Sequence, residues 1–262
     1  MKKTETTAKE IHFIEQNKGG AGKTTLVTLL GLMYDSRGTF VPKEVKEDEN
    51  SPVMFVDADN HNYSLSKKQV FLKGKNPSVL RIEELLDSNR RMVRDRFMTS
   101  LKDWSILPYE RFYVDLGAGE SEELVNLIEL KYNIDLLKKY ADSLNIKIVH
   151  DVVISGGTNF TINFDYLKNM VALNKGVFDL NIWVNLYTFY EQQFLIDEVN
   201  EFAKIANKKI PNSVTSVKQF GGFDNHSEIT SEIIAKLSAG KGYEEFEMIE
   251  KWELDSQFEN LK

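Results

Sequence analysis

The apolar residues of this chain form two kinds of pattern. Short continuous apolar runs have the length of strands buried on both faces of a sheet, and they occur at residues 11–14, 53–58, 112–114, 146–155 and 179–188. Longer stretches repeat their apolar residues every three or four positions, as helices do, and they occur at residues 24–37, 79–101, 121–144, 160–173, 189–207 and 227–237. This alternation predicts an α/β fold with a doubly wound, mostly parallel sheet flanked by helices.

The segments between these patterns indicate the domain organisation. The chain has 262 residues, and we expect residues 1–262 to form a single domain. Residues 1–10 are polar and predict a flexible lead-in, and residues 38–52 hold prolines and acids typical of an exposed polar loop. Residues 241–262 predict an acidic C-terminal helix that docks on the domain. Its apolar positions are Phe246, Ile249, Trp252 and Phe258.

Composition and charge exclude several classes of protein. The chain has no cysteine, which excludes disulfides, thiolate metal sites and cysteine nucleophiles. Its net charge of −7 argues against broad, passive adhesion to DNA. No stretch approaches the roughly 20 apolar residues of a membrane span, and the charged first residues precede no apolar signal segment. The glutamate-rich C-terminal segment would be repelled by anionic lipid. We therefore expect a soluble, cytoplasmic protein.

Arginines are concentrated between residues 79 and 101. They are Arg81, Arg90, Arg91, Arg94 and Arg96. On one helix such a cluster could contact DNA phosphates directly. Because Asp87 and Asp95 lie among them, the sequence favours the other interpretation, an ordinary solvated helix of mixed charge.

The most informative stretch is IHFIEQNKGGAGKTT at residues 11–25, where a strand pattern, a glycine-rich turn and a helix pattern follow one another. Glycines let backbone N–H groups turn toward phosphate oxygens, and a helix N-terminus favours negative charge. The common phosphate-loop spacing requires a glycine where Asn17 stands, and the loop instead has an additional lysine, Lys18. We expect Lys23 to reach the β- and γ-phosphates and the Thr24 hydroxyl to bind Mg²⁺. The nucleotide-binding residues expected here are Gly19, Gly20, Ala21, Gly22, Lys23, Thr24 and Thr25.

Two further strand patterns end in acids. Residues 53–58 lead to Asp57 and Asp59, and residues 111–114 lead to Asp115, which is followed by Gly117 and Gly119. Ligands of parallel α/β sheets bind beyond the carboxyl ends of the strands. Asp115 is therefore expected to bind Mg²⁺ through water, and the two glycines are expected to form a switch that responds to the γ-phosphate.

The segment KGGAGKTT resembles the signature of the ParA/MinD family of dimerising P-loop ATPases with a deviant Walker A loop. The resemblance implies that Lys18 reaches the phosphates held by a partner subunit in a nucleotide sandwich dimer; the alternative is a solvated loop lysine. It also implies that Asp57 organises the water shell of the metal and that Asp59 orients the attacking water. The alternative for Asp59 is a turn cap with Asn60.

The same resemblance places a base-reading amide at Asn185, which otherwise only ends its strand. His150, the Gly156–Gly157 pair, residues 183–186 and the switch DLGAG are similar to the TraL/StbB type of ParA-like ATPase from conjugative and mobilisable plasmids. We expect His150 to be a packed strand histidine and not a catalytic residue.

Together the residues and the resemblance imply an ATPase that uses ATP and Mg²⁺, forms a homodimer on binding ATP, and times assembly in plasmid or DNA partitioning or in conjugative transfer. The implied partner is a DNA-binding, relaxase or adaptor protein. An alternative is a nucleotide-gated adaptor that barely hydrolyses ATP, because the DLGAG switch departs from the usual family form. A third is a carboxylate-phosphorylating ligase of the dethiobiotin-synthetase kind, and Lys18 counts against it because those enzymes generally lack this lysine.

Overall fold

The computed structural model describes residues 8–38, 53–60, 62–73, 79–131 and 133–261. In this part of the chain a seven-stranded sheet has the order β3-β2-β4-β1-β5-β6-β7, and all of its strand pairs are parallel. The strands are β1 (Lys9–Glu15), β2 (Val53–Ala58), β3 (Leu80–Ile82), β4 (Arg111–Leu116), β5 (Ile146–Ile154), β6 (Asp179–Asn185) and β7 (Ser216–Phe220). The α/β fold with a parallel sheet that the sequence predicts is therefore confirmed.

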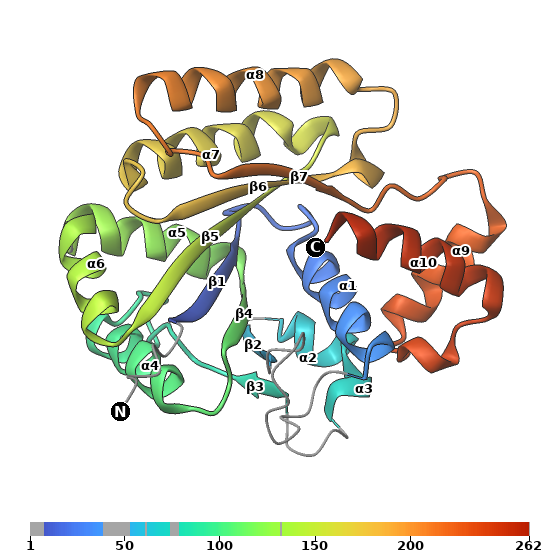
Figure 1. Ribbon diagram of the computed structural model, residues 1–262, viewed down its shortest axis with the longest axis horizontal. Coiled ribbons are helices and arrows are strands. Elements are labelled where there is room, and N and C mark those ends of the chain that lie inside the picture. Colours follow the sequence, from blue (N-terminus) through green and yellow to red (C-terminus); the bar gives the residue numbers. More distant parts are fainter. Residues whose placement is uncertain (1–7, 39–52, 61, 74–78, 132, 262) are drawn as a thin grey trace, which may run out of the picture.

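Helices cover both faces of this sheet (Figure 1). The α-helices are α1 (Lys23–Ser36), α2 (Ser64–Lys68), α3 (Val70–Lys73), α4 (Arg94–Ile106), α5 (Ala118–Asn126), α6 (Ile134–Ser143), α7 (Phe160–Asn174), α8 (Gln193–Lys209), α9 (Glu228–Ser238) and α10 (Met248–Asn260). Short connecting turns are the π-helical η1 (Leu127–Lys131) and the 3₁₀ turns η2 (Gly157–Asn159), η3 (Leu186–Thr188) and η4 (Tyr243–Glu245).

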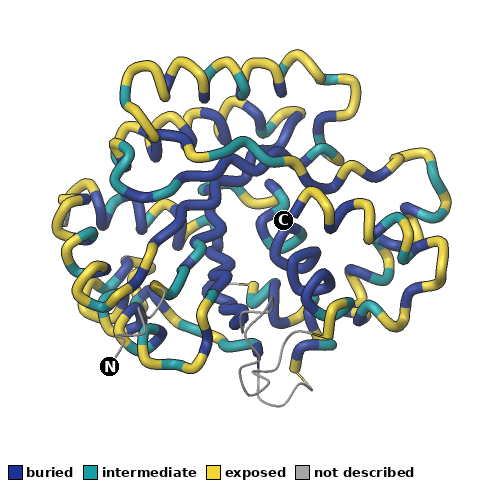
Figure 2. Tube along the Cα trace, viewed as in Figure 1, coloured by how far each residue is buried: buried dark blue, intermediate teal, exposed yellow. Residues whose placement is uncertain are grey.

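Alternation along the strands divides the core between the two faces. On β2, Phe55 packs in a cluster with residues of α1, α9 and α10, whereas its neighbour Val56 packs in a cluster with residues of α4, α5 and α6. A third cluster joins α7 and α8 to β5 and β6. Figure 2 shows α1 buried along most of its length, whereas α8 exposes its outer side. The first helix is therefore held on several sides, and the loop before it has a rigid support.

The helix expected at residues 79–101 forms only from Arg94 onward, and the prediction is wrong for residues 79–93. The chain there forms β3, a turn and only then α4, which begins at Arg94. Leu80 pairs with Phe55 on β2, so the apolar residues at the start of this segment extend the sheet. In the turn, the Asp87 side chain accepts hydrogen bonds from the backbone N–H groups of Asn89 and Arg91, both at 2.9 Å. This local bonding offers the backbone an alternative to the helix.

The arginines of this segment consequently do not share one helix. Arg81 pairs with Glu83 at 2.8 Å, and Arg91 pairs with Glu123 at 3.3 Å. Arg96 donates to the carbonyl oxygen of Leu86 at 2.6 Å. Contacts within the chain therefore use charges that a DNA-binding face would need.

The start of β1 and the end of α1 mark where the expected lead-in ends and the expected polar loop begins. β1 begins at Lys9, so the last residues of the expected lead-in belong to the sheet, where Glu10 pairs with Arg111 at 2.6 Å. Residues 1–7 lie outside the described part of the chain. So does the expected polar loop at 38–52, apart from Gly38, which ends the first helix with φ 62°.

The C-terminal helix docks on the domain with only part of the predicted face. Phe246 and Phe258 are buried against the α1 side of the core, as expected. Ile249 and Trp252 are 50% and 66% exposed, so their expected packing is wrong. The helix uses Leu254 for its contact instead. Among the described residues, no helix is both long and apolar enough to cross a membrane.

His150 is a packed strand histidine, as predicted. It lies in the middle of β5 and is 1% exposed. Its Nδ1 lies 3.1 Å from the Glu15 carboxylate on the neighbouring strand β1. Both groups are enclosed by the sheet and its helices, and neither lines the hollows described below.

Candidate functional site

The glycine-rich loop connects the carboxyl end of β1 to the first turn of α1, in the middle of the sheet. Gly20 and Gly22 adopt left-handed conformations with φ 80° and 104°, which glycine reaches without strain. A Cβ on Gly22 would also lie 2.4 Å from the Asn185 amide nitrogen. A Cβ on Gly19 or Gly20 would meet nothing within 4 Å, so this side of the loop is open.

The open side of the loop borders a cavity of about 320 Å³, which we call the loop hollow. Residues that follow three strands, in the loops and in the helices after them, surround it. They are Gly19, Gly20, Ala21, Gly22, Lys23, Thr24, Thr25, Asp59, Asn62, Ser64, Lys68, Leu116, Gly117 and Ala118. The structure thus brings together the phosphate-loop residues, Asp59 and Gly117, which are far apart in the sequence.

Lys23 is buried beneath the loop. Its ammonium group donates to the Gln16 carbonyl oxygen at 2.8 Å and lies 3.5 Å from the Lys18 carbonyl oxygen. Burial lowers the pKa of Lys23, and the nearby Asp115 carboxylate works in the opposite direction. A phosphate group in the hollow would supply the negative charge that this buried cation favours.

Thr24 lines the loop hollow and contacts Asp115, a buried carboxylate that is not among the residues lining the cavity. The Thr24 hydroxyl donates to Asp115 Oδ2 at 2.8 Å. Asp115 Oδ1 is buried and has no hydrogen-bond partner. Burial raises the pKa of Asp115 to about 7, and the carboxylates of Asp57 and Asp59 add to this effect. A buried carboxylate with an unpartnered oxygen beside a threonine hydroxyl is a donor set that fits Mg²⁺.

The coordination would depend on phosphate and water for its remaining oxygens. The described residues contain no group of three or more His, Cys, Asp or Glu side chains able to hold a metal ion. Mg²⁺ usually keeps several waters and binds through one or two carboxylates together with substrate phosphates. The residues present are therefore suited to a metal that arrives with a nucleotide.

The two acids after β2 occupy different places. Asp57 is fully buried, and its carboxylate accepts the backbone N–H groups of Ser66 at 2.7 Å and of Asp59 at 3.3 Å. Asp57 lies opposite Asp115 in the sheet but does not line the loop hollow. Burial raises the pKa of Asp57. Its contacts anchor the start of α2, and its contribution to a metal-water shell stays a prediction.

Asp59 reaches the loop hollow. Its Oδ2 accepts a hydrogen bond from the Ser64 hydroxyl at 3.1 Å, and its Oδ1 accepts the backbone N–H of Asn62, also at 3.1 Å. Ser64 also lies 3.1 Å from the Thr24 hydroxyl oxygen. Asp59 therefore does cap a turn through the Asn62 N–H, whereas the Asn60 N–H donates to Glu120 Oε1 at 3.2 Å. The Asp59 carboxylate also faces the cavity where phosphates would bind.

Of the two glycines after Asp115, only Gly117 borders the site. A Cβ on Gly117 would lie 2.1 Å from Glu120 Oε2 and 2.9 Å from Asp59 Oδ1. Gly119 lies inside α5 and does not line the loop hollow. The structure therefore places Gly119 in a helix and leaves Gly117 as the residue at which the β4 loop approaches Asp59.

Lys18 stands apart from the site of its own chain. It is half-buried, and its side chain does not line the loop hollow. Within the described ranges, we find no hydrogen bond or ion pair made by its ammonium group. Whether it reaches the nucleotide of a partner subunit stays a prediction.

Asn185 lies at the carboxyl end of β6, beside the loop. Its amide nitrogen donates to the Ala21 carbonyl oxygen at 3.1 Å, which ties the phosphate loop to this strand. It also lines a smaller cavity of about 130 Å³, which we call the apolar hollow. The other lining residues are Thr25, Thr28, Lys68, Tyr187, Gly221, Phe223, Ile234, Leu237 and Ser238. This cavity is the place where a base could meet the Asn185 amide.

The sequence did not identify Asn62, Ser64, Lys68 or the aromatic residues Tyr187 and Phe223 as part of a site. Ser64 could have been suspected, because it follows the Asp57–Asp59 segment within a few residues. Lys68, Tyr187 and Phe223 have no recognisable local signal. They join the site only because α2, the end of β6 and the loop after β7 meet beside α1.

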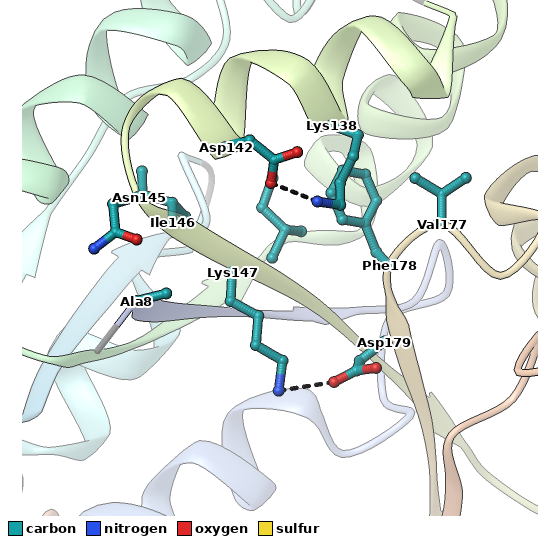
Figure 3. Close-up of a pocket in the computed structure, with 10 residues that line it drawn as sticks. Ala8, Lys138, Asp142, Asn145, Ile146, Lys147, Val177, Phe178 and Asp179 are labelled. Atoms are coloured by element: carbon teal, nitrogen blue, oxygen red, sulfur yellow. Dashed lines mark hydrogen bonds and ion pairs between the residues drawn. The ribbon is translucent and has the colours of Figure 1, made fainter. Parts of the chain in front are cut away.

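A further cavity of about 300 Å³ lies at the other end of the strands and serves as a contrast (Figure 3). Its charged residues are already paired, Lys147 with Asp179 at 2.8 Å and Lys138 with Asp142. The ion pairs there compensate both lysines, whereas the loop hollow is lined by Lys23, whose ammonium group contacts only carbonyl oxygens within the described residues. The loop hollow is thus the better candidate for a charged ligand.

Similarity to known proteins is confined to solved structures. No protein-family model matches this chain, and no curated protein matches it. Among solved structures, the chain is similar to a plasmid partition protein from Borrelia burgdorferi, with a TM-score of 0.46 and 11% sequence identity. The alignment covers 88% of this chain and 96% of that chain.

Proposed function

We propose that this protein is a Mg²⁺-dependent ATPase whose ATP-bound form is a face-to-face homodimer. The observation that supports this most is the pairing of a glycine loop that is open to a cavity with a buried Asp115 oxygen that lacks a partner. The loop suits phosphate groups, and the oxygen suits the cation that accompanies them. The additional lysine of the segment KGGAGKTT, Lys18, supports the proposed dimer.

The residues in and beside the loop hollow would have separate roles in hydrolysis. Backbone N–H groups of residues 19–24 would bind the phosphates, and Lys23 would exchange its bond to the Gln16 carbonyl for a phosphate oxygen. Thr24 and Asp115 would hold Mg²⁺, which when bound supplies charge neutralisation. Asp59 would orient the attacking water from the rim of the cavity. Phosphoryl transfer needs mainly this positioning and charge stabilisation.

The proposed dimer gives ATP the role of a timer. Binding would assemble two copies through Lys18, and hydrolysis would release them. Such a cycle would time the assembly of a complex in plasmid or DNA partitioning or in conjugative transfer, together with a DNA-binding, relaxase or adaptor partner. The arginines between residues 81 and 96 are dispersed over three local structures, so we assign DNA contact to the partner.

The experiment for this proposal is the Lys18→Ala variant, measured by analytical ultracentrifugation with ATP and Mg²⁺. We expect the variant to bind ATP but to stay monomeric and to lose ATP turnover. The matched control is Lys139→Ala, which removes an exposed lysine from α6, away from the loop. ATP-dependent dimers of unchanged stability in the Lys18 variant would contradict the sandwich arrangement.

Asp59→Ala separates the ATPase from a nucleotide-gated adaptor. In an ATPase, the variant should accumulate the ATP dimer, because the attacking water has lost its orienting carboxylate. Single-turnover kinetics of the natural chain, with and without a partner, provide the reference rate. Negligible hydrolysis in both conditions would favour the adaptor, and normal hydrolysis by the variant would contradict the role of Asp59.

A further inference from the structure

The loop hollow and the apolar hollow adjoin each other, and two residues line both of them. These residues are Thr25, in the first turn of α1, and Lys68, at the end of α2. A ligand that occupies both cavities would lie against both of these side chains, at a shared boundary that we call the passage. The passage is therefore bounded by one small hydroxyl and one cation.

The two cavities differ in chemistry in the way that the two ends of a nucleotide differ. The loop hollow has the open glycines and the buried Lys23, which suit phosphate. The apolar hollow has Tyr187, Phe223 and aliphatic residues of α9, which suit a flat aromatic ring. With the terminal phosphates in one cavity and the base in the other, the α-phosphate lies at the passage.

Lys68 has a charge that the chain itself does not use. In the described portion of the chain, its ammonium group makes no hydrogen bond or ion pair. It is half-buried, whereas its neighbour Lys67 is exposed and lines neither cavity. The two lysines of this short helix thus differ in burial and in whether they line the cavities.

The backbone of Lys68 is held in place from both sides. On one side, the Ser66 N–H donates to the buried Asp57 carboxylate at 2.7 Å. On the other side, the turn after α9 approaches so closely that a Cβ on Gly240 would lie 2.8 Å from the Lys68 carbonyl oxygen. Gly240 has φ 71°, so both its conformation and this contact require glycine. A lysine anchored in this way is available to a ligand without a large rearrangement of the chain.

We propose that Lys68 binds the α-phosphate of the nucleotide and so links the phosphate site to the base site. This assignment rests on the proposed function, because it requires that a nucleoside triphosphate is the ligand. A lysine ammonium is a compact charge on a flexible stem and can follow a phosphate oxygen as the ligand enters. The contact strengthens binding at the α-phosphate, which lies between the terminal phosphates at Lys23 and the base at Asn185.

The position of the contact determines its kinetic effect. Transfer of the γ-phosphoryl group changes charge at the terminal phosphates, and the α-phosphate keeps its charge throughout. An interaction that is equal in the ground state and the transition state affects KM and leaves kcat unchanged. Lys68 is thus a nucleotide-binding residue whose effect differs from those of Lys23 and Asp59.

The test compares Lys68→Gln with Lys67→Gln in the full chain, using calorimetric titration with ATP and with ADP in the presence of Mg²⁺. Both ligands carry an α-phosphate, so we expect Lys68→Gln to weaken both by the same factor, about tenfold. Lys67→Gln should stay within about twofold of the natural chain. Steady-state hydrolysis by Lys68→Gln should show a raised KM and an unchanged kcat.

A third variant, Lys68→Arg, separates lost charge from lost folding. It should recover most of the affinity, because a cation is again present at the passage. Equal affinities of Lys68→Gln and Lys67→Gln would overturn the assignment while leaving the ATPase proposal intact, and so would a fall in kcat at constant KM. A natural chain that binds neither ATP nor ADP would overturn the ATPase proposal itself, and the assignment with it.

Discussion

Two aspartates in this sheet are equally buried but have opposite environments. Asp115 is the next-to-last residue of β4 and Asp151 lies within β5, on the two strands that flank β1, and each is 1% exposed. Asp151 accepts hydrogen bonds from Asn181 at 2.8 Å and Trp183 at 2.7 Å, and His12 lies 2.6 Å from its other oxygen. Asp115 accepts one hydrogen bond, from Thr24, and its other oxygen has no partner.

The pKa values of the two carboxyls follow from these contacts. Burial works against ionisation of Asp151, yet the charge and hydrogen bond of His12 hold the pKa of Asp151 below its ordinary value. Burial raises the pKa of Asp115 to about 7, because the nearby Lys23 offsets this only in part. A fully bonded buried carboxylate stabilises the fold, whereas an incompletely bonded one at a cavity is a candidate for binding a ligand.

The largest effect is expected from Asp151→Ala. This change leaves His12, Asn181 and Trp183 without their shared acceptor, so we expect the free energy of unfolding to fall by about 3 to 5 kcal/mol. Urea denaturation measures the loss, and Asp151→Asn is the matched control because it keeps an acceptor oxygen. ATP affinity of the folded fraction should not change. A loss below about 1 kcal/mol would contradict the structural role of Asp151.

The next effect is expected from Asp115→Asn, and it should appear in activity instead. The change removes the charge at nearly constant shape, so ATP hydrolysis with Mg²⁺ should fall by roughly 100-fold or more. Without nucleotide and metal, the free energy of unfolding at neutral pH should change little, because the cost of burying the Asp115 charge is removed while the buried Lys23 loses a nearby compensating charge. A large loss of stability with intact hydrolysis would show that Asp115 resembles Asp151.

A smaller effect is expected from Gly117→Ala. The added Cβ collides with Glu120 and Asp59, so we expect a loss of about 1 to 3 kcal/mol in stability and a slower hydrolysis step. The matched control is Gly119→Ala, where nothing lies within 4 Å and the residue is helical. There we expect a gain of about 0.5 to 1 kcal/mol. Thermal unfolding and steady-state kinetics of both variants test this prediction. Equal stabilities and equal hydrolysis rates of the two variants would contradict it.

The failure at residues 79–101 shows where local pattern stops being sufficient. Leu80 and Ile82 have a spacing that fits a strand, whereas Val79, Ile82, Leu85 and Leu86 have one that fits a helix. Pairing at the edge of the sheet makes this segment a strand, because Leu80 pairs with Phe55 on β2. Because β3 and the turn after it replace the first part of the expected helix, the arginines of this segment do not share one helix.

By itself, the sequence predicted the strands β1, β2, β4, β5 and β6, the glycine loop before the first helix, and the acids at the ends of β2 and β4, but it did not predict β3, α2 or α3. The predicted features follow from apolar spacing and local backbone chemistry, which act over a few residues. Only the tertiary structure decided that Asp115 keeps an unpartnered oxygen, that Ser64 joins Asp59 to Thr24, and that Lys68 stands between two cavities. Those features depend on how separate elements pack around α1, and no local pattern encodes that packing.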